Sequence, residues 1–353
     1  MKIQPDILTM NDGQPVRDPS QWAARRAELI ELFTREEYGR LPSAPARLSG
    51  AVLQTQDTAD GEYAAVDCVR ITFDTPTGEF ALPMRLYRFA DGEKHPVFLL
   101  LHYGETPDDR FPFEEISRAG VVLAVVSCGA IAADNADFTT GLAGHYPRKG
   151  NGDDWGKLGM WAWGVSRCVD YLLQRADVDA SGIAVVGHSR LGKAVLLAAA
   201  LDERVQFAFI NDSGCGGAAL ERCKREGAET IAFMNDRFPY WFCENRAKYA
   251  KDISAMPFDQ HFVLAAIAPR FACVGAAVDD GWSDPYGMQL ACVGASDAWQ
   301  LLGKKGFCGS TAPARAGDAF LDGCVAYHLR EGGHDLNRTD WLTYLAFFEK
   351  HKA

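Results

Sequence analysis

Residues 185–193, which read VVGHSRLGK, constrain what this chain can fold into more than any other stretch. An apolar run ends at Gly187, Ser189 follows, and a helical pattern begins at Leu191. A strand that stops at a glycine, exposes a serine and enters a helix at once is typical of a nucleophile elbow, because the helix N-terminus offers backbone N–H groups to a developing oxyanion. Gly192 stands three residues after the serine, so the common G-x-S-x-G spacing is stretched by one. The alternative is an ordinary strand-to-helix junction in which Ser189 only caps the helix.

Apolar runs alternate with helical patterns from residue 96 to the end of the chain. The strand-like runs read PVFLLLHYG, VVLAVVSCG, IAVVG, VQFAFINDSG, FACVGAAVDD and GCVAYHLREGGH, and the helical ones include WGKLGMWAWGVSRCVDYLLQR and TDWLTYLAFFEKH. Uninterrupted β-rich runs indicate strands that are buried on both faces. We therefore expect an α/β fold, a three-layer sandwich with a mostly parallel central sheet and helices on both faces.

The first 95 residues follow a different pattern. An irregular arm precedes a helical pattern over residues 20–38, and residues 48–90 alternate apolar and polar side chains around a turn at Thr77 and Gly78. This alternation predicts antiparallel strands at one edge of the sheet. We expect one domain over residues 1–353, with a catalytic core over residues 96–353. Insertions at 130–154 and 214–258 are long for loops and should build the substrate cleft.

Charge and cysteine content exclude several classes of function. A formal net charge of −11 argues against nucleic acid or an anionic membrane surface as the main partner. No apolar stretch reaches the roughly 18 residues of a transmembrane helix. The start, MKIQPDILTMNDGQP, lacks the apolar core of a signal peptide, so we expect a cytoplasmic protein. The ten cysteines stand singly, which predicts buried reduced thiols and no zinc or iron–sulfur site. We expect no metal and no cofactor.

A serine nucleophile needs a base and an acid, and in an α/β-hydrolase the chain order is serine, acid, histidine. His334, in EGGHDL, follows the last predicted strand and precedes the last helix, which is where the base belongs. Asp280, in AAVDDGWSDP, and Asp212, in FINDSG, follow successive strands. Either carboxylate can orient the imidazole, and the sequence leaves both open with a small preference for Asp280.

The other histidines are weaker candidates. His188 stands beside the serine, but strand alternation should point it away from the nucleophile. His328 lies inside a predicted strand and should pack there. His261 belongs to a predicted helix near the cleft, and His102 ends an early strand, where it either packs or helps to form the oxyanion hole.

Cations and aromatic residues surround the elbow in the sequence. Arg190 follows the serine directly, so its guanidinium could hold an oxyanion or a substrate carbonyl. Lys193 lies one helical turn further along and could face the same cleft; a salt bridge on an exposed helix face is the alternative for both. Trp282, beside a candidate acid, and Trp241, in the second insertion, could stack on a sugar ring or form part of a lid or core. The sequence therefore favours an acidic or polyhydroxylated substrate.

Several motifs together resemble one known family. GHSRLGK resembles the G-C-S-R-x-G-K elbow of glucuronoyl esterases, carbohydrate esterase family fifteen. GMWAWGVSRCVDYL is similar to the helix before that elbow, and NDSGCGGAAL is similar to the E-S-G-x-G-G segment after the next strand. AETIAFMNDRFPYWFCEN, FDQHFVLAAIAPR, DDGWSDPYG and YHLREGGHD resemble bacterial members, so the similarity covers roughly residues 96–350 in order.

The resemblance implies an α/β-hydrolase that cleaves esters of 4-O-methyl-glucuronic acid, as in glucuronoxylan. It implies Ser189 as nucleophile, His334 as base and Arg190 as an oxyanion donor. The family acid stands at the position of Asp212 in some members and of Asp280 in others. By the same resemblance, the uronate sugar would be bound by Lys193, Glu229 and Trp282.

Three positions depart from the family pattern. His188 stands where the family has a cysteine, and Asp335 stands where fungal members have its disulfide partner. Asp212 also stands where a glutamate is usual.

The sequence thus predicts a serine esterase that forms an acyl-enzyme with a small-molecule or oligosaccharide ester. One alternative is an acetyl esterase that acts on acetylated xylan sugars. The alternative from another class is a non-catalytic carbohydrate-binding protein on a hydrolase scaffold. The oligomeric state and the alcohol half of the ester stay open.

Overall fold

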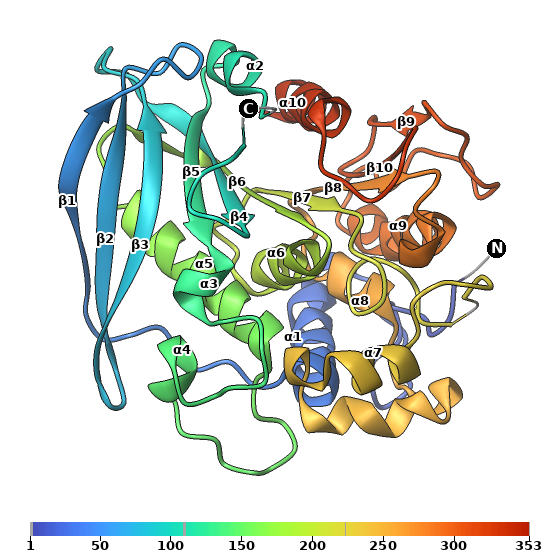
Figure 1. Cartoon of the computed structure of the whole chain (residues 1–353). Coiled ribbons are helices and arrows are strands. Elements are labelled where there is room, and N and C mark those ends of the chain that lie inside the picture. Colours follow the sequence, from blue (N-terminus) through green and yellow to red (C-terminus); the bar gives the residue numbers. More distant parts are fainter. Residues whose placement is uncertain (1–2, 109–110, 223, 353) are drawn as a thin grey trace.

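The computed structural model describes residues 3–108, 111–222 and 224–352. Within these residues one ten-stranded sheet has the strand order β1-β2-β3-β5-β4-β6-β7-β8-β10-β9 (Figure 1). The strands are Leu48–Asp57 (β1), Ala65–Thr75 (β2), Gly78–Arg88 (β3), His95–His102 (β4), Val122–Ser127 (β5), Val178–His188 (β6), Phe207–Asn211 (β7), Phe271–Ala277 (β8), Ala319–Phe320 (β9) and Val325–Arg330 (β10). The series β5-β4-β6-β7-β8-β10 is parallel throughout, which confirms the predicted mostly parallel sheet.

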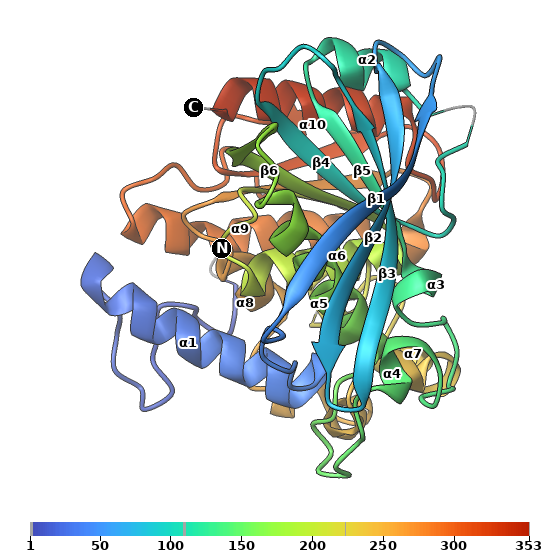
Figure 2. The same cartoon turned by 90° about the vertical axis from the view of Figure 1, so that its left-hand side faces the viewer.

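Strands β1 to β3 form the antiparallel edge that the alternating residues 48–90 predict. The pairing of Thr75 with Gly78 closes the β2–β3 hairpin, and β3 joins the parallel strands by pairing antiparallel with β5. The β1–β2 register shifts between Val52 and Gln54, so Leu53 is a bulge residue. Figure 2, in which this edge faces the viewer, shows the three long strands twisting across the front of the molecule.

The helices are α1 (Trp22–Phe33), α2 (Phe113–Arg118), α3 (Cys128–Ile131), α4 (Gly141–Gly144), α5 (Lys157–Leu172), α6 (Arg190–Leu201), α7 (Ile231–Arg237), α8 (Gln260–Ala265), α9 (Pro285–Leu301) and α10 (Arg338–His351). Short 3₁₀ turns cover Pro19–Gln21, Pro239–Trp241, Glu244–Ala250, Ile253–Ala255 and Gly281–Ser283, and a π-helical turn covers Thr34–Tyr38. The helix predicted over residues 20–38 is therefore present as a 3₁₀ turn, α1 and a π turn in succession.

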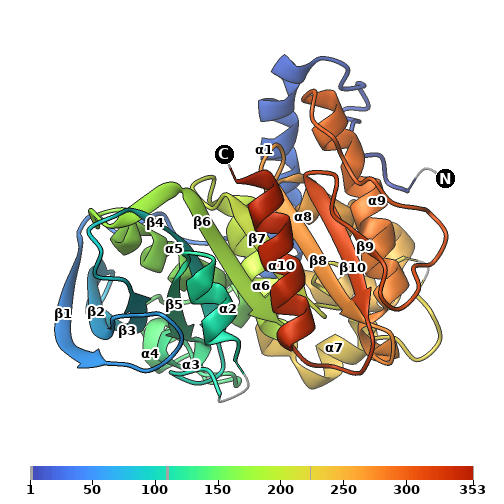
Figure 3. The same cartoon turned by 90° about the horizontal axis from the view of Figure 1, so that it is seen from above.

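Strand alternation divides the buried side chains between two cores, one on each face of the sheet. On β4, Val97, Leu99 and Leu101 belong to one core, and Phe98 and Leu100 belong to the other. Helices α5, α6, α8 and α9 cover the first face, with α1 packed below α8. Helices α2 and α10 cover the second face, and Figure 3 shows α10 lying across the strands. The predicted helices on both faces are confirmed.

Helix α9 is the long element that the sequence analysis does not predict. It is buried on most sides, so its residues read as apolar runs and not as an amphipathic stripe. Its start carries ordinary helix signals, since the Asp284 side chain accepts a hydrogen bond from Gly287 N and Pro285 occupies the first turn. Asp284 therefore caps α9.

The cysteines and the helices bear on two further expectations. All nine described cysteines are free thiols, and seven of them are buried, as predicted; Cys223 lies outside the described residues. Trp161 and Trp163 are core residues. No helix in the described part of the chain has the length and apolar content needed to cross a bilayer.

Candidate active site

The elbow joins β6 to α6 at the carboxyl edge of the parallel strands. Strand β6 ends at His188, helix α6 begins at Arg190, and Ser189 between them has φ 58° and ψ −128°. The Ser189 N–H donates to the carbonyl of Asn211 on the neighbouring strand β7, at 2.9 Å. The first turn of α6 directs unpaired backbone N–H groups toward this point, as stabilisation of an oxyanion requires.

His334 and Asp280 form a hydrogen-bonded pair beside the elbow. His334 follows β10, Asp280 follows β8, and the imidazole Nδ1 lies 2.7 Å from Asp280 Oδ2. Ser283 Oγ donates to the same carboxylate oxygen at 2.5 Å. Burial by itself would raise the pKa of Asp280, but the hydrogen bonds from His334 and Ser283 outweigh it and lower the pKa. Asp280 is therefore an anion that holds Nδ1–H and leaves Nε2 of His334 free as a base.

Asp212 lies close to this pair but bonds elsewhere. One oxygen of Asp212, one of Asp280 and a ring nitrogen of His334 lie within 4.8 Å of one another. The Asp212 carboxylate accepts from Ala277 N at 3.1 Å and from Arg330 Nη2 at 3.3 Å. Burial raises the pKa of Asp212 to about 8, and the nearby Asp280 adds to the rise. A proton on Asp212 and a guanidinium beside it make this trio a poor cation site.

Arg190 is held at the mouth of the elbow by both insertions. Its Nη1 donates to Asp134 Oδ2 at 2.6 Å, and Trp241 Nε1 donates to Asp134 Oδ1 at 2.6 Å. The guanidinium lies 4.8 Å from the centre of the Trp241 ring. Trp241 itself is only 2% exposed and stacks on Phe238. Trp241 therefore acts on the site through Asp134 and Arg190 and offers no open face for sugar stacking.

Lys193, Glu229 and Trp282 form a continuous chain of hydrogen bonds. The buried ammonium of Lys193 donates to the carbonyls of Ser213 and Cys215, at 2.6 and 2.8 Å, and pairs with Glu229 Oε2 at 3.1 Å. Glu229 Oε1 accepts from Trp282 Nε1 at 2.7 Å. Trp282 is 44% exposed, so the chain runs from the protein interior to an open aromatic surface.

His188 does not point away from the site, contrary to the expectation from strand alternation. Its ring centre lies 4.5 Å from that of His334, and Nδ1 donates to Asn211 Oδ1 at 2.6 Å. Burial lowers the pKa of His188 to about 4, and His334 adds to the decrease. A neutral imidazole therefore packs against the candidate base.

Three further histidines bond to groups other than Ser189, Asp280 and His334. His328 is buried and bonds Asp340 at 2.8 Å, as a packed strand residue should. His261 is on helix α8 as predicted, but its Nε2 bonds the Pro5 carbonyl in the N-terminal arm and not a cleft group. His102 bonds the backbone of Gly104.

Four residues that are not predicted from the sequence also support the site: Tyr103, Asp134, Asn211 and Ser283. Asp134 has a detectable signal, because a cation next to a nucleophile needs a carboxylate and the first insertion is rich in aspartate. The Tyr103 ring lies 5.7 Å from the Arg190 guanidinium. No local sequence signature marks Tyr103, Asn211 or Ser283.

Comparisons with known proteins agree with this geometry. A family model described as glucuronyl esterase, fungi, matches residues 70–303. The chain is 32% identical to carbohydrate esterase MZ0003 from an unknown prokaryotic organism, in an alignment that covers 98% of this chain and 89% of that protein. The chain belongs to the glucuronoyl esterase family.

Further relatives extend the match to structure. A solved glucuronoyl esterase from Solibacter usitatus has 34% sequence identity and a TM-score of 0.89, with 99% of this chain and 97% of that chain covered. The 4-O-methyl-glucuronoyl methylesterase of Hypocrea jecorina (strain QM6a) is 30% identical over 84% of this chain and 62% of its own length. The resemblance inferred from the elbow and its companion motifs is confirmed, and the fold is that of an α/β-hydrolase.

Asp212→Asn in this glucuronoyl esterase family member should flatten the pH dependence of stability. The pKa of Asp212 rises from 3.8 to about 8 on folding, so between these values the folded protein keeps a proton that the unfolded chain has lost. The free energy of unfolding must then fall as pH rises through this window. Between pH 5 and pH 8, the free energy of unfolding measured with urea should fall by more for wild type than for D212N. Equal losses would contradict the elevated pKa.

Proposed function

We propose that this protein is a serine-dependent glucuronoyl esterase that hydrolyses esters of 4-O-methyl-glucuronic acid. The observation that carries the proposal is the His334–Asp280 hydrogen bond, which holds the imidazole against the elbow, with its ring centre 4.5 Å from that of His188, the residue before Ser189. The substrate class is supported by relatives named 4-O-methyl-glucuronoyl methylesterase.

The reaction would proceed by two acyl transfers. Ser189 Oγ attacks the ester carbonyl while Nε2 of His334 takes the hydroxyl proton, and Asp280 stabilises the resulting imidazolium. The Arg190 guanidinium and the backbone N–H groups at the start of α6 bind the oxyanion of the tetrahedral intermediate. His334 then gives the proton to the departing alcohol. Water, deprotonated by His334, releases the uronic acid from Ser189 and restores the serine.

The chain Lys193–Glu229–Trp282 supplies the sugar recognition in this proposal. Trp282 presents a ring face on which a pyranose can stack. The Glu229 carboxylate, which the Lys193 ammonium and the Trp282 indole hold in place, offers an acceptor for ring hydroxyls. A plain acetyl ester would use none of these groups, which is why the acetyl esterase alternative is less favoured. The intact serine, histidine and acid argue against the non-catalytic alternative.

Ser189→Ala should remove hydrolysis of benzyl glucuronate. Loss of a triad serine costs several kcal/mol of transition-state stabilisation, so kcat/KM should fall roughly a thousandfold or more. Para-nitrophenyl acetate, assayed in parallel, should be the poorer substrate of the wild type. Activity on para-nitrophenyl acetate alone would indicate that acetylated sugars are the substrates. If neither ester shows serine-dependent turnover and a serine-directed phosphonate does not label the protein, the non-catalytic carbohydrate-binding alternative is favoured.

Asp280→Asn and Asp212→Asn should separate the two candidate acids. Asp280 hydrogen-bonds His334, so D280N should lower kcat for benzyl glucuronate by about a thousandfold or more, as loss of a triad acid does elsewhere. Asp212 carries a proton near neutral pH, which the amide mimics, so D212N should stay within about tenfold of wild type. The reverse order would assign the acid to Asp212.

Trp282→Ala should weaken recognition of the uronate ring without touching the chemistry. The KM for benzyl glucuronate should rise about fivefold, because one stacking contact is worth about 1 kcal/mol, while turnover of para-nitrophenyl acetate stays unchanged. Trp282→Phe keeps a ring but loses the bond to Glu229, so an intermediate KM is expected. An unchanged KM in both variants would remove Trp282 from the sugar site.

A further inference from the structure

The loop after β4 stands where an α/β-hydrolase keeps part of its oxyanion hole. In that fold the loop after an early parallel strand supplies a donor to the oxyanion, usually a backbone N–H group. Here β4 pairs with β6, the strand of the elbow, on the side opposite β7. The N–H of Gly104 in this loop donates to Nδ1 of His102 at 3.2 Å. This backbone donor is therefore in use within the loop, and the Tyr103 side chain between the two residues brings a donor of another kind.

The Tyr103 hydroxyl lies at the elbow. It is 3.5 Å from the carbonyl oxygen of His188, the residue before Ser189. The centre of its ring lies 5.7 Å from the Arg190 guanidinium. Burial raises the pKa of Tyr103 above its ordinary value, although the charge of Arg190 and a hydrogen bond with the Ser189 side chain oppose the rise. The phenol is therefore neutral near pH 7 and keeps the proton with which it donates.

Two donors beside Ser189 lack a good acceptor. A separation of 3.5 Å makes the bond from Tyr103 to the His188 carbonyl weak. The Arg190 Nε atom is buried and has no hydrogen-bond partner among the residues that the structure describes. Catalytic hydrogen bonds are often long in a free enzyme and tighten in the transition state. Both groups are thus available to an oxygen that gains negative charge at the carbon attacked by Ser189.

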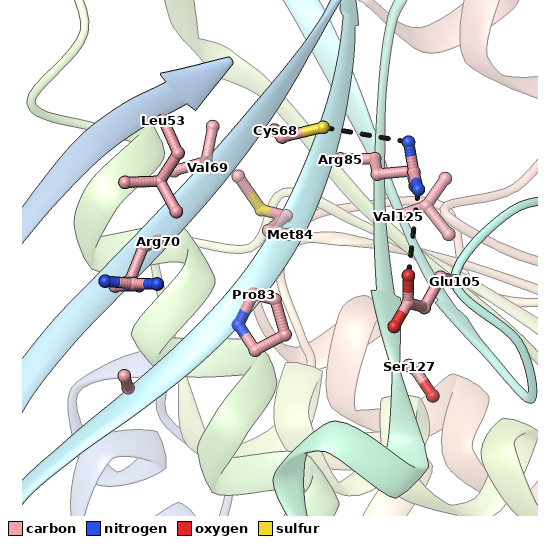
Figure 4. A pocket seen from close by; sticks show the side chains of 11 residues that line it. Leu53, Cys68, Val69, Arg70, Pro83, Met84, Arg85, Glu105, Val125 and Ser127 are labelled. Atoms are coloured by element: carbon pink, nitrogen blue, oxygen red, sulfur yellow. Dashed lines mark hydrogen bonds and ion pairs between the residues drawn. The ribbon is translucent and has the colours of Figure 1, made fainter.

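The backbone of Tyr103 is fixed by contacts from the neighbouring strands. Ser127, the last residue of β5, donates from Oγ to the Tyr103 carbonyl at 3.1 Å. Further along the same loop, Glu105 lies 3.7 Å from Arg85 of β3. Figure 4 shows this ion pair, with Ser127 close to Glu105 on the wall of the pocket at the antiparallel edge. Tyr103 is therefore held before substrate arrives, as electrostatic stabilisation of a transition state requires.

We propose that the Tyr103 hydroxyl is a catalytic donor of the oxyanion hole. The sheet order supports this role, because β4 lies on one side of β6 while β8 and β10, which precede Asp280 and His334, lie on the other. When Ser189 Oγ bonds to the ester carbon, the π electrons of the carbonyl move to its oxygen. Tyr103 donates a hydrogen bond to that oxygen and keeps its proton. The electrons return when the alcohol leaves, so the phenol is unchanged.

This inference rests on the proposed serine esterase reaction but not on the identity of the ester. Tyr103→Phe removes the hydroxyl and keeps the ring. The kcat for benzyl glucuronate should fall about a hundredfold, as loss of one oxyanion donor does elsewhere, with KM within about twofold of wild type. The kcat for para-nitrophenyl acetate should fall by a similar factor, because both esters form the same oxyanion. Trp282→Ala, by contrast, should affect the uronate ester alone.

Tyr171→Phe is the matched control. It also loses a phenol hydroxyl, which accepts from Arg175 near the end of α5, so both kcat values should match those of wild type. Tyr103 is 46% exposed and its hydroxyl is weakly bonded. Neither substitution should therefore prevent folding, and urea unfolding checks this for both variants.

Labelling by a serine-directed phosphonate gives a readout that needs no substrate. The phosphoryl oxygen gains charge in the same hole, so Y103F should slow the labelling of Ser189 about tenfold or more. If Y103F hydrolyses both esters and reacts with the phosphonate like wild type, the role of Tyr103 is overturned and the esterase proposal stands. A raised KM with unchanged kcat would also overturn it, because Tyr103 would then be a binding contact. If wild type shows neither Ser189-dependent turnover nor labelling, the proposed function fails, and the role of Tyr103 fails with it.

Discussion

The turn at Ser189 is the constraint on which the rest of the site depends. A positive φ costs a non-glycine residue roughly 1–3 kcal/mol, so the surroundings must hold it. A Cβ on Gly187 would lie 2.4 Å from the Leu191 carbonyl oxygen, and a Cβ on Gly192 would lie 2.8 Å from that of Asn211. Both glycines are therefore required for α6 to lie this close to β6 and β7. This explains why a glycine three residues after the serine, instead of two, still closes the turn.

The same turn determines where the two cations of α6 point. Arg190, in the first position of the helix, meets Asp134 and Trp241 from the two insertions. Lys193 is one turn further and nearly fully buried, so its charge needs several acceptors. The carbonyls of Ser213 and Cys215 and the carboxylate of Glu229 provide them. The insertions are thus anchored on the elbow helix, and the cleft depends on the geometry of a single turn.

Much of this could be predicted from the sequence because its signals are local. Buried strands read as continuous apolar runs, the hairpin edge alternates with period two, and the elbow has its own pattern. Helix α9 was missed because a helix buried on most sides loses its amphipathic stripe. The sequence alone does not distinguish Asp212 from Asp280 as the acid, since they follow neighbouring strands that end at the same edge of the sheet. Only the hydrogen bond to His334 distinguishes them. The burial of Trp241 likewise depends on Asp134, which lies 107 residues away in sequence.

His188 shows how one substitution within the family pattern is accommodated. Its position in the resemblance belongs to a cysteine, yet here an imidazole packs on the His334 ring. Asn211 links the two halves of the site, because its side chain accepts from His188 and its carbonyl accepts from Ser189 N. Since burial, and then His334, lower the pKa of His188 to about 4, the ring stays neutral and does not repel the imidazolium that the proposed reaction forms on His334. The exposed loop of His334 is therefore supported by Asp280 through a hydrogen bond and by His188 through ring contact, without a covalent bond.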